Sequence, residues 1–161
     1  MKKVLLPVFA VLVFALTSCG GADPVKFNDA LSKANTEIAN VSTEYQNTIV
    51  KSMEANNFAA ISAQTDSALA KIDKEIDIVK NLDAPKGGEA FKEAAIKAYE
   101  SVRGFVETGR QFSTLTEEST QDDVMKISNE YDGKVNEYSK LFDELVKAQA
   151  DYAKEAGYRV Q

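Results

Sequence analysis

The sequence predicts an all-α protein, an antiparallel up-down-up-down four-helix bundle that follows a separate N-terminal segment. Three observations support this fold class. The chain of 161 residues is rich in Ala, Lys and Glu after its first 23 positions, and only two prolines occur there. Apolar side chains recur every three or four residues in four successive segments, which is the period of an amphipathic helix. The breaks between these segments are short, so neighbouring helices are expected to run antiparallel.

Residues 1–18 have the layout of a secretory signal peptide that is removed from the mature protein. The basic residues Lys2 and Lys3 precede an apolar run over residues 4–16, and two small polar residues follow. A transmembrane helix needs about 20 predominantly apolar residues, whereas this run is shorter and contains Pro7. We therefore expect cleavage of this segment and not a permanent membrane span.

The stretch Leu16-Thr17-Ser18-Cys19 resembles the lipobox of bacterial lipoproteins, in which a Leu and two small residues precede a Cys. The resemblance implies that the Cys19 thiol carries a diacylglyceryl group and that the new amino terminus is usually acylated as well. Two or three acyl chains on one residue give lasting membrane attachment, whereas a single chain is marginal. Since Cys19 is the only cysteine, its modification also excludes a disulfide. The alternative is an unlipidated soluble or periplasmic protein in which Cys19 is incidental.

Residues 19–23 then form a short tether between the lipid and the first helix. At roughly 3.3 Å per extended residue, the tether from Cys19 to Pro24 spans at most about 17 Å, which keeps the bundle close to the bilayer. Gly20 occupies the position at which an Asp retains some lipoproteins in the inner membrane, so the sequence favours the outer membrane over the inner membrane.

The first helix is expected over residues 24–55. Asp23 is a favourable N-cap, and the ring of Pro24 suits the first helical position. The apolar stripe of this helix consists of Phe27, Leu31, Ala34, Ile38, Val41, Tyr45, Ile49 and Met53.

The second helix is expected over residues 58–82. The two asparagines at positions 56 and 57 tolerate turn conformations, so the chain is expected to reverse there. Pro85 disfavours helix at the residue before it, and the Gly87-Gly88 pair supplies a flexible connection. The apolar stripe consists of Phe58, Ile61, Thr65, Leu69, Ile72, Ile76 and Val79.

The third helix is expected over residues 88–115, and its stripe contains small residues. Gly104, Gly109 and several alanines favour close contact with a neighbouring helix. The same feature leaves open a groove beside Phe105, Gly109 and Phe112 that would hold a small apolar ligand. The stripe consists of Phe91, Ala95, Ala98, Val102, Phe105, Gly109 and Phe112.

The fourth helix is expected over residues 120–156, followed by a tail over residues 157–161. Thr120 and Asp123 have the spacing of a capping pair. The apolar stripe keeps its phase through Gly133, so we expect one continuous helix with an exposed weak point there. The stripe consists of Val124, Ile127, Tyr131, Val135, Tyr138, Phe142, Leu145, Ala148 and Tyr152.

The composition excludes several classes of chemistry. The sequence contains no histidine, which removes di-iron sites built from Glu-x-x-His pairs, His-ligated haem, Cys/His zinc sites and His-based catalysis. The acidic residues fall mainly on the polar sides of the stripes, as expected for solvated helix faces. We therefore predict no metal, no catalytic residue and no cofactor other than the covalent lipid. Removal of Lys2 and Lys3 changes the formal charge from −6 to −8, which disfavours nucleic acid as a partner.

The segment after the tether resembles the start of a family of small helical surface lipoproteins of unknown function. In that family a Pro-Val-x-aromatic-Asn-Asp stretch follows the lipidated cysteine, and the matching positions here are Pro24, Val25, Phe27, Asn28 and Asp29. The resemblance implies a lipid-anchored helical bundle and adds no activity. Asn28 and Asp29 are equally consistent with ordinary first-turn residues.

Taken as a whole, the sequence predicts a non-enzymatic lipoprotein of the bacterial cell envelope that acts as a binding or structural module, with an envelope protein as its expected partner. A second hypothesis is a carrier or sensor that holds a small apolar ligand between its helices. A third, an enzyme that uses carboxylates alone, requires two converging Asp or Glu side chains in a cleft.

Overall fold

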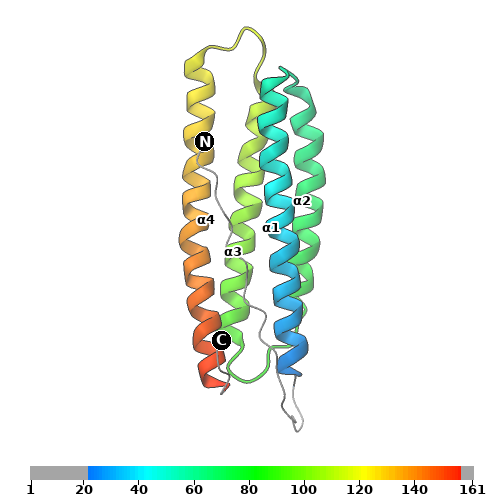
Figure 1. The fold of residues 1–161 in the computed structure, drawn as a ribbon, viewed down its shortest axis with the longest axis vertical. Coiled ribbons are helices and arrows are strands. Elements are labelled where there is room, and N and C mark those ends of the chain that lie inside the picture. The colour runs from blue at the N-terminus through cyan, green and yellow to red at the C-terminus, as the bar shows by residue number, and fades with distance from the viewer. Residues whose placement is uncertain (1–21, 157–161) are drawn as a thin grey trace.

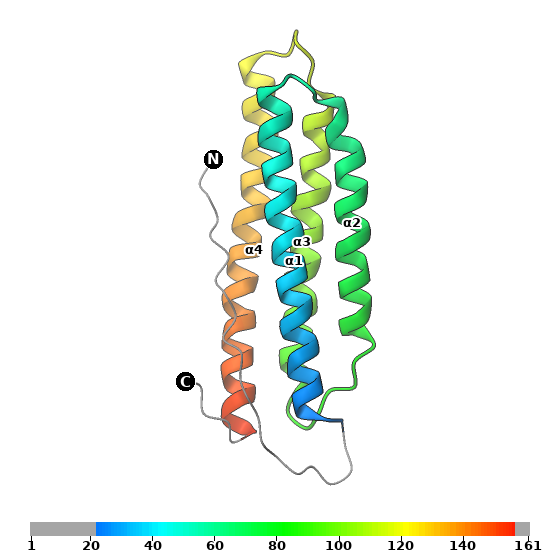
Figure 2. The same cartoon turned by 45° about the vertical axis from the view of Figure 1, so that its right-hand side comes forward.

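The predicted all-α, up-down-up-down four-helix bundle is confirmed in the computed structural model, which describes residues 22–156. Each of the four long helices runs antiparallel to the next one in the chain, and the described residues contain no strand (Figures 1 and 2). No helix in this range is both long and apolar enough to cross a membrane.

Helix α1 spans Pro24–Glu54, and its first turn is capped as the sequence predicts. The Asp23 carboxylate accepts hydrogen bonds from the backbone N–H groups of Val25 and Lys26, at 3.0 and 3.4 Å. After α1 the chain reverses through Asn56, whose φ of +51° lies in the left-handed region that asparagine tolerates better than most residues.

Helix α2 spans Ala59–Lys80 and helix α3 spans Glu89–Gly109. The connection between them turns at Gly87, whose φ of +82° favours glycine. The ammonium group of Lys92 donates to the backbone carbonyls of Lys80 and Leu82, at 2.8 and 2.6 Å. The first bond satisfies the carbonyl of the last residue of α2, which has no partner within the helix, and the second joins Lys92 to the α2–α3 connection.

The third α-helix is shorter than the sequence indicates, because the chain tightens into a 3₁₀ helix, η1, at Arg110–Thr114. Phe112 and Leu115 remain buried, so the apolar pattern continues although the backbone changes. Short 3₁₀ turns are common at helix ends.

Helix α4 spans Gln121–Glu155 without a break at Gly133, which is exposed. Its N-terminus carries the predicted capping box. The Thr120 hydroxyl accepts from the backbone N–H of Asp123 at 3.2 Å, and the Asp123 carboxylate accepts from the backbone N–H of Thr120 at 2.9 Å.

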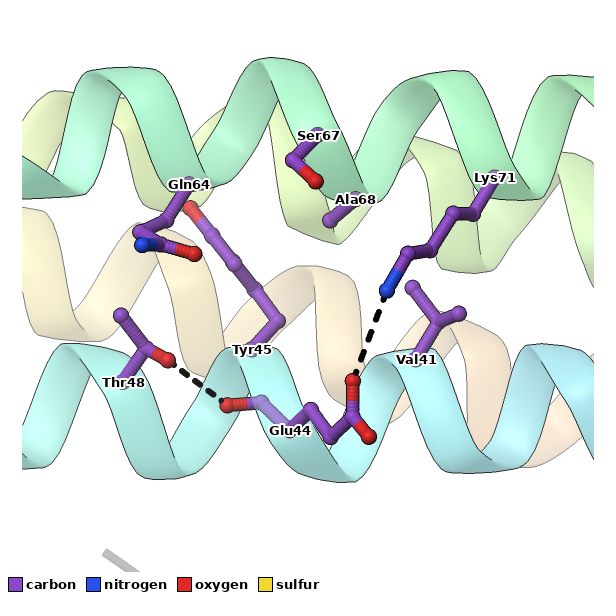
Figure 3. A pocket seen from close by; sticks show the side chains of 8 residues that line it. All are labelled: Val41, Glu44, Tyr45, Thr48, Gln64, Ser67, Ala68 and Lys71. Atoms are coloured by element: carbon purple, nitrogen blue, oxygen red, sulfur yellow. Dashed lines mark hydrogen bonds and ion pairs between the residues drawn. The ribbon is translucent and has the colours of Figure 1, made fainter.

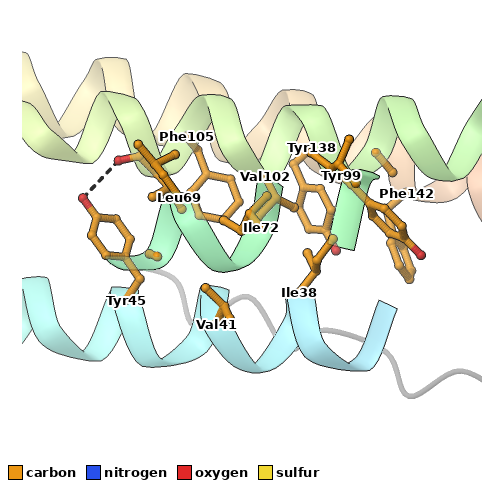
Figure 4. Packing of buried hydrophobic residues seen from close by; sticks show 14 of the residues in the cluster. Ile38, Val41, Tyr45, Leu69, Ile72, Tyr99, Val102, Phe105, Tyr138 and Phe142 are labelled. Atoms are coloured by element: carbon orange, nitrogen blue, oxygen red, sulfur yellow. Dashed lines mark hydrogen bonds between the residues drawn. The ribbon is translucent and has the colours of Figure 1, made fainter. Parts of the chain in front are cut away.

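The core runs along the bundle axis and is rich in aromatic rings (Figure 4). Ring pairs such as Phe27 with Tyr152 and Phe91 with Tyr152 have centroids 5.8 Å apart, within the range of favourable aromatic contact. The buried aromatic residues are Phe27, Tyr45, Phe91, Tyr99, Phe105, Phe112, Tyr131, Tyr138, Phe142 and Tyr152.

The two ends of the bundle differ in which loops they carry. The start of α1, the α2–α3 connection and the end of α4 lie at one end, which we call the basal end (Figure 1). The α1–α2 turn and the segment between η1 and α4 lie at the other, the distal end. Any group attached just before α1 is therefore attached at the basal end.

Candidate functional site

Cys19, the predicted lipidation residue, lies outside the residues that the structure describes, as does the rest of the predicted signal segment. The first described residues are Ala22 and the N-cap Asp23. The described domain therefore begins at the end of the predicted tether.

The three residues predicted to border an interior groove are all buried. The rings of Phe105 and Phe112 each lie edge-on to Tyr131 of α4, with centroids 5.8 Å apart. A methyl group built on Gly109 would lie 2.5 Å from the hydroxyl oxygen of Tyr45 and 2.8 Å from its ring. The Tyr45 side chain thus fills the space beside Gly109, and the missing side chain is used for close packing of α1 on α3.

Tyr45 is the centre of a buried polar link between three helices. Its hydroxyl donates to the backbone carbonyl of Val106 in α3 at 3.0 Å and lies 2.8 Å from the hydroxyl of Thr65 in α2. Burial raises the pKa of Tyr45 to about 12, and the hydrogen bond with Thr65 partly opposes that rise. Figure 4 shows this side chain crossing from α1 into the core. These hydrogen bonds join α1, α2 and α3 in the core.

A small pocket lies between α1 and α2, directly beside Tyr45 (Figure 3). Its volume is about 90 Å³, and polar side chains surround an apolar floor. Glu44 and Lys71 face each other across it at 3.7 Å, and both side chains are more than half exposed. Exposed pairs of this kind contribute about 0–1 kcal/mol. The pocket is small for an organic ligand.

A larger cavity of about 530 Å³, open to solvent, lies at the distal end, between the α1–α2 turn and the segment before α4. Its apolar wall consists of Met53, Phe58, Leu115 and Val124. Its polar rim consists of Asn56, Thr116, Glu117 and Ser119. Ligand sites typically combine such an apolar wall with a few polar groups, in volumes of about 300–1,000 Å³.

A third depression, of about 450 Å³, lies at the basal end where α3 begins and α4 ends. Glu89, Glu144, Asp151 and Glu155 line it, with Lys147 among them. Within residues 22–156, however, no group of three or more His, Cys, Asp or Glu side chains is arranged to hold a metal ion. Ala90, Ala148 and Tyr152 also line the depression, so it combines acidic side chains with apolar surface.

Unpartnered buried polar atoms occur in the basal half of α1 and α4. The side chain of Asn28 is 1% exposed, and neither its amide nitrogen nor its amide oxygen has a hydrogen-bond partner. The hydroxyl of Ser32 and the amide nitrogen of Gln149 are also buried without a partner. Each such group destabilises a folded protein by about 1–3 kcal/mol.

Charged side chains are rare among the buried residues that the structure describes. Glu75 is the one charged side chain among the described buried residues, and the other buried polar residues are Asn, Ser, Thr and Tyr. In the sequence, Asn28 is consistent only with a family motif or an ordinary first turn, and its burial becomes visible only in the folded structure. The distal cavity was not predicted, because its walls come from two loops that are far apart in the chain.

Comparison with known proteins gave no match: no family model, no curated protein and no solved structure is significantly similar to this chain.

Proposed function

We propose that the protein is a lipid-anchored, non-enzymatic binding or structural module of the bacterial cell envelope. The observation that carries this proposal is the lipobox-like stretch Leu16-Thr17-Ser18-Cys19, which ends four residues before the N-cap Asp23. An acylated Cys19 would hold the basal end near the bilayer and leave the distal cavity facing away from it. Gly20 favours the outer membrane, and an envelope protein is the expected partner.

The distribution of charge supports a non-enzymatic role. The carboxylates of α4 lie on its exposed positions, including Asp122, Asp132, Glu137 and Asp143. A carboxylate-only enzyme needs two acids that converge on a reacting atom in a cleft. The exposed acids of α4 are spread along the helix, and those that line the basal depression form no group of three or more that could hold a metal ion among the described residues.

The anchor is tested by replacing Cys19 with Ala and following radiolabelled palmitate in cells. We expect the wild-type chain to incorporate label and to fractionate with membranes, and C19A to lose both properties, because only a thiol accepts the diacylglyceryl group. Ser18→Ala keeps a small residue in the motif and serves as the matched control, with labelling retained. A wild-type chain without label, together with membrane-bound C19A, would refute the anchor.

A second candidate function is that of a carrier or sensor for a small apolar ligand, and the distal cavity favours it. Because Tyr45 fills the space beside Gly109, the distal cavity is the better-supported location for such a ligand. Met53 in its wall gives an adaptable apolar surface.

This candidate is tested with the neutral fluorescent probe N-phenyl-1-naphthylamine and the full chain. We expect Val124→Glu, in the wall of the cavity, to weaken binding of the probe by about tenfold or more, since a carboxylate replaces an apolar contact. Val146→Glu is the matched control on the same helix, because Val146 is 45% exposed and lies outside the cavity. Equal weakening in both variants, or no binding to the wild type, argues against the cavity.

A further inference from the structure

The contact between α1 and α4 differs from the other contacts between neighbouring helices. The backbone of α1 packs closely on α2 and α3, and that of α4 packs closely on α3, whereas α1 and α4 make little close backbone contact. Figure 2 looks onto this junction. Side chains bridge it at the basal end, where the ring of Phe27 meets that of Tyr152.

The side of α1 that faces α4 is polar. Burial raises the pKa of Tyr131 in α4, and the nearby side chain of Gln46 partly opposes this rise. The side of α1 that carries Gln46 therefore faces α4. Asn28 lies 18 residues before Gln46, which is five full helical turns, and therefore projects from the same side. Asn35 and Ser42 follow Asn28 at steps of seven residues and are 7% and 2% exposed.

Gln149 is the counterpart of these residues on α4. It lies three residues before Tyr152 and so projects from the same face, one turn away. Because Tyr152 contacts Phe27, and Asn28 is the next residue of α1, Gln149 and Asn28 lie at the same end of the junction. We call this region, made by Asn28, Ser32 and Gln149, the basal seam.

The basal seam has an unusual combination of burial and unused hydrogen-bonding capacity. The amide of Asn28, the hydroxyl of Ser32 and the amide nitrogen of Gln149 are buried without partners. A buried Asn that fixes helix register does so by pairing with another polar group. Asn28 has no such pair, so a role in fixing helix register does not explain why it is buried. Natural proteins tolerate buried polar groups without partners mainly at functional sites, such as binding sites.

The chemistry of the basal seam defines the class of ligand. Asn28 offers two N–H donors and one carbonyl acceptor, and Gln149 and Ser32 add further donors. None of the three is charged, so an ionic ligand would be desolvated there without an opposite charge. The neighbouring ring of Phe27 suits an apolar or aromatic body. A neutral molecule that carries a carboxamide matches all these groups.

We propose that the basal seam is a binding site for a small neutral carboxamide with an apolar body, and that Asn28 is its recognition residue. The ligand enters as α4 moves away from α1, which the sparse backbone contact between them allows. This inference rests on the proposed binding function and specifies one site for it. It is independent of the lipid anchor, which the palmitate experiment tests separately.

The test compares benzamide with acetophenone, which has the same shape but a methyl group in place of the amide nitrogen. The full chain, labelled with ¹⁵N in neutral detergent, is titrated to roughly 10 mM of each compound, which detects a Kd near 1 mM. We expect benzamide to shift the side-chain NH₂ signals of Asn28 and Gln149 saturably. Acetophenone should act at least about tenfold more weakly, because it leaves polar groups of the site unpaired.

Two variants make the test specific. Asn28→Leu should abolish the effect of benzamide and raise the melting temperature, because an unpartnered polar group is replaced by an apolar one of similar size. Asn40→Leu, at an exposed position of the same helix, should retain binding. Equal effects of the two compounds, absence of a saturable shift, or unchanged benzamide binding by Asn28→Leu would each overturn the proposal.

Discussion

At the residue scale, the packing of α1 on α3 depends on the absence of a side chain at Gly109. A methyl group there would overlap the Tyr45 ring and approach Ile49 within 3.1 Å. Tyr45 cannot move aside freely, because its hydroxyl is bonded to Val106 and Thr65. We expect Gly109→Ala to lower the free energy of unfolding by about 1–3 kcal/mol, measured by urea denaturation.

Gly104, five residues earlier in α3, is the matched control. A methyl group built there meets no heavy atom within 4 Å. Gly104→Ala should therefore raise stability by up to about 1 kcal/mol through helix propensity alone. A change in the free energy of unfolding that has the same sign in both variants would contradict the packing role of Gly109.

The buried hydroxyl of Tyr45 links stability to alkaline pH. Its pKa rises from 10.0 to about 12 in the folded protein, so the unfolded chain loses this proton first. The stabilisation is complete below pH 10 and is lost as pH rises towards 12. This rise in the pKa of Tyr45 corresponds to a loss of stability on the order of 2–3 kcal/mol.

Urea denaturation between pH 8 and 12 measures this dependence. Tyr45→Phe should be less stable at pH 8, because the Val106 carbonyl loses its side-chain donor, yet it should lose less stability on further alkalinisation than the wild type. Burial also raises the pKa values of Tyr99, Tyr131 and Tyr138, so part of the dependence remains. An identical slope in wild type and variant would contradict this account of Tyr45.

At the scale of the elements, the capping box sets where α4 begins. Thr120→Ala removes the acceptor for the backbone N–H of Asp123 and should destabilise the protein by about 1 kcal/mol, measured by thermal or urea denaturation. Thr43→Ala, at an exposed position inside α1, is the control and should be neutral or slightly stabilising. Equal effects at both positions would mean that the cap contributes nothing.

The capping box also makes the stability of the folded protein depend on pH in the acidic range. The hydrogen bonds from Thr120 hold the pKa of Asp123 below its usual value of 3.8. The stabilisation of the folded protein by the ionised Asp123 carboxylate is therefore present above pH 3.8 and is lost as pH falls through the lowered pKa.

The helices were predictable because their signals are local. Caps such as Asp23 and Thr120, the Pro85 break and the apolar stripes all act within a few residues, and the structure follows them. The end of α3 was not predictable to the same degree, because Phe112 and Leu115 are buried whether the last turn is α or 3₁₀. Periodicity over a single turn does not separate the two geometries.

At the scale of the whole molecule, polar links between helices are distributed unevenly. Within residues 22–156, these links join mainly α1, α2, α3 and η1, as in Tyr99 to Leu31, Arg103 to Asp73 and Arg110 to Asp66. The link between Gln111 of η1 and Glu130 reaches α4. Helix α4 is held largely by apolar packing on α3.

We therefore expect α4 to open before the other helices. Native-state hydrogen exchange should report an opening free energy for the amides in the middle of α4 that is lower than for α1 and α3, by roughly 1 kcal/mol or more. The exposed Gly133 weakens the same helix further. Uniform protection across all four helices would show that the bundle opens only as a unit.

The candidate sites were harder to predict than the fold, for a physical reason. Asn28 lies one position from the stripe residue Phe27, and the sequence alone assigns it to the first turn of a solvated helix. Its burial depends on how the other parts of the folded chain pack against α1. The distal cavity likewise needs Phe58 and Leu115 to meet. Such contacts depend on how helices pack, which helical periodicity does not encode.

The 31-residue length of α1 also sets the distance between the basal end and the distal end. At 1.5 Å per residue, α1 is about 46 Å long, whereas the surface potential of a membrane decays over about 8 Å at physiological ionic strength. With Cys19 in the bilayer, the basal end would lie within the field of the lipid headgroups, and the distal cavity would lie outside it. Binding at the distal end would then not depend on the proportion of anionic lipid in the membrane. Binding at the acidic basal depression would depend on it.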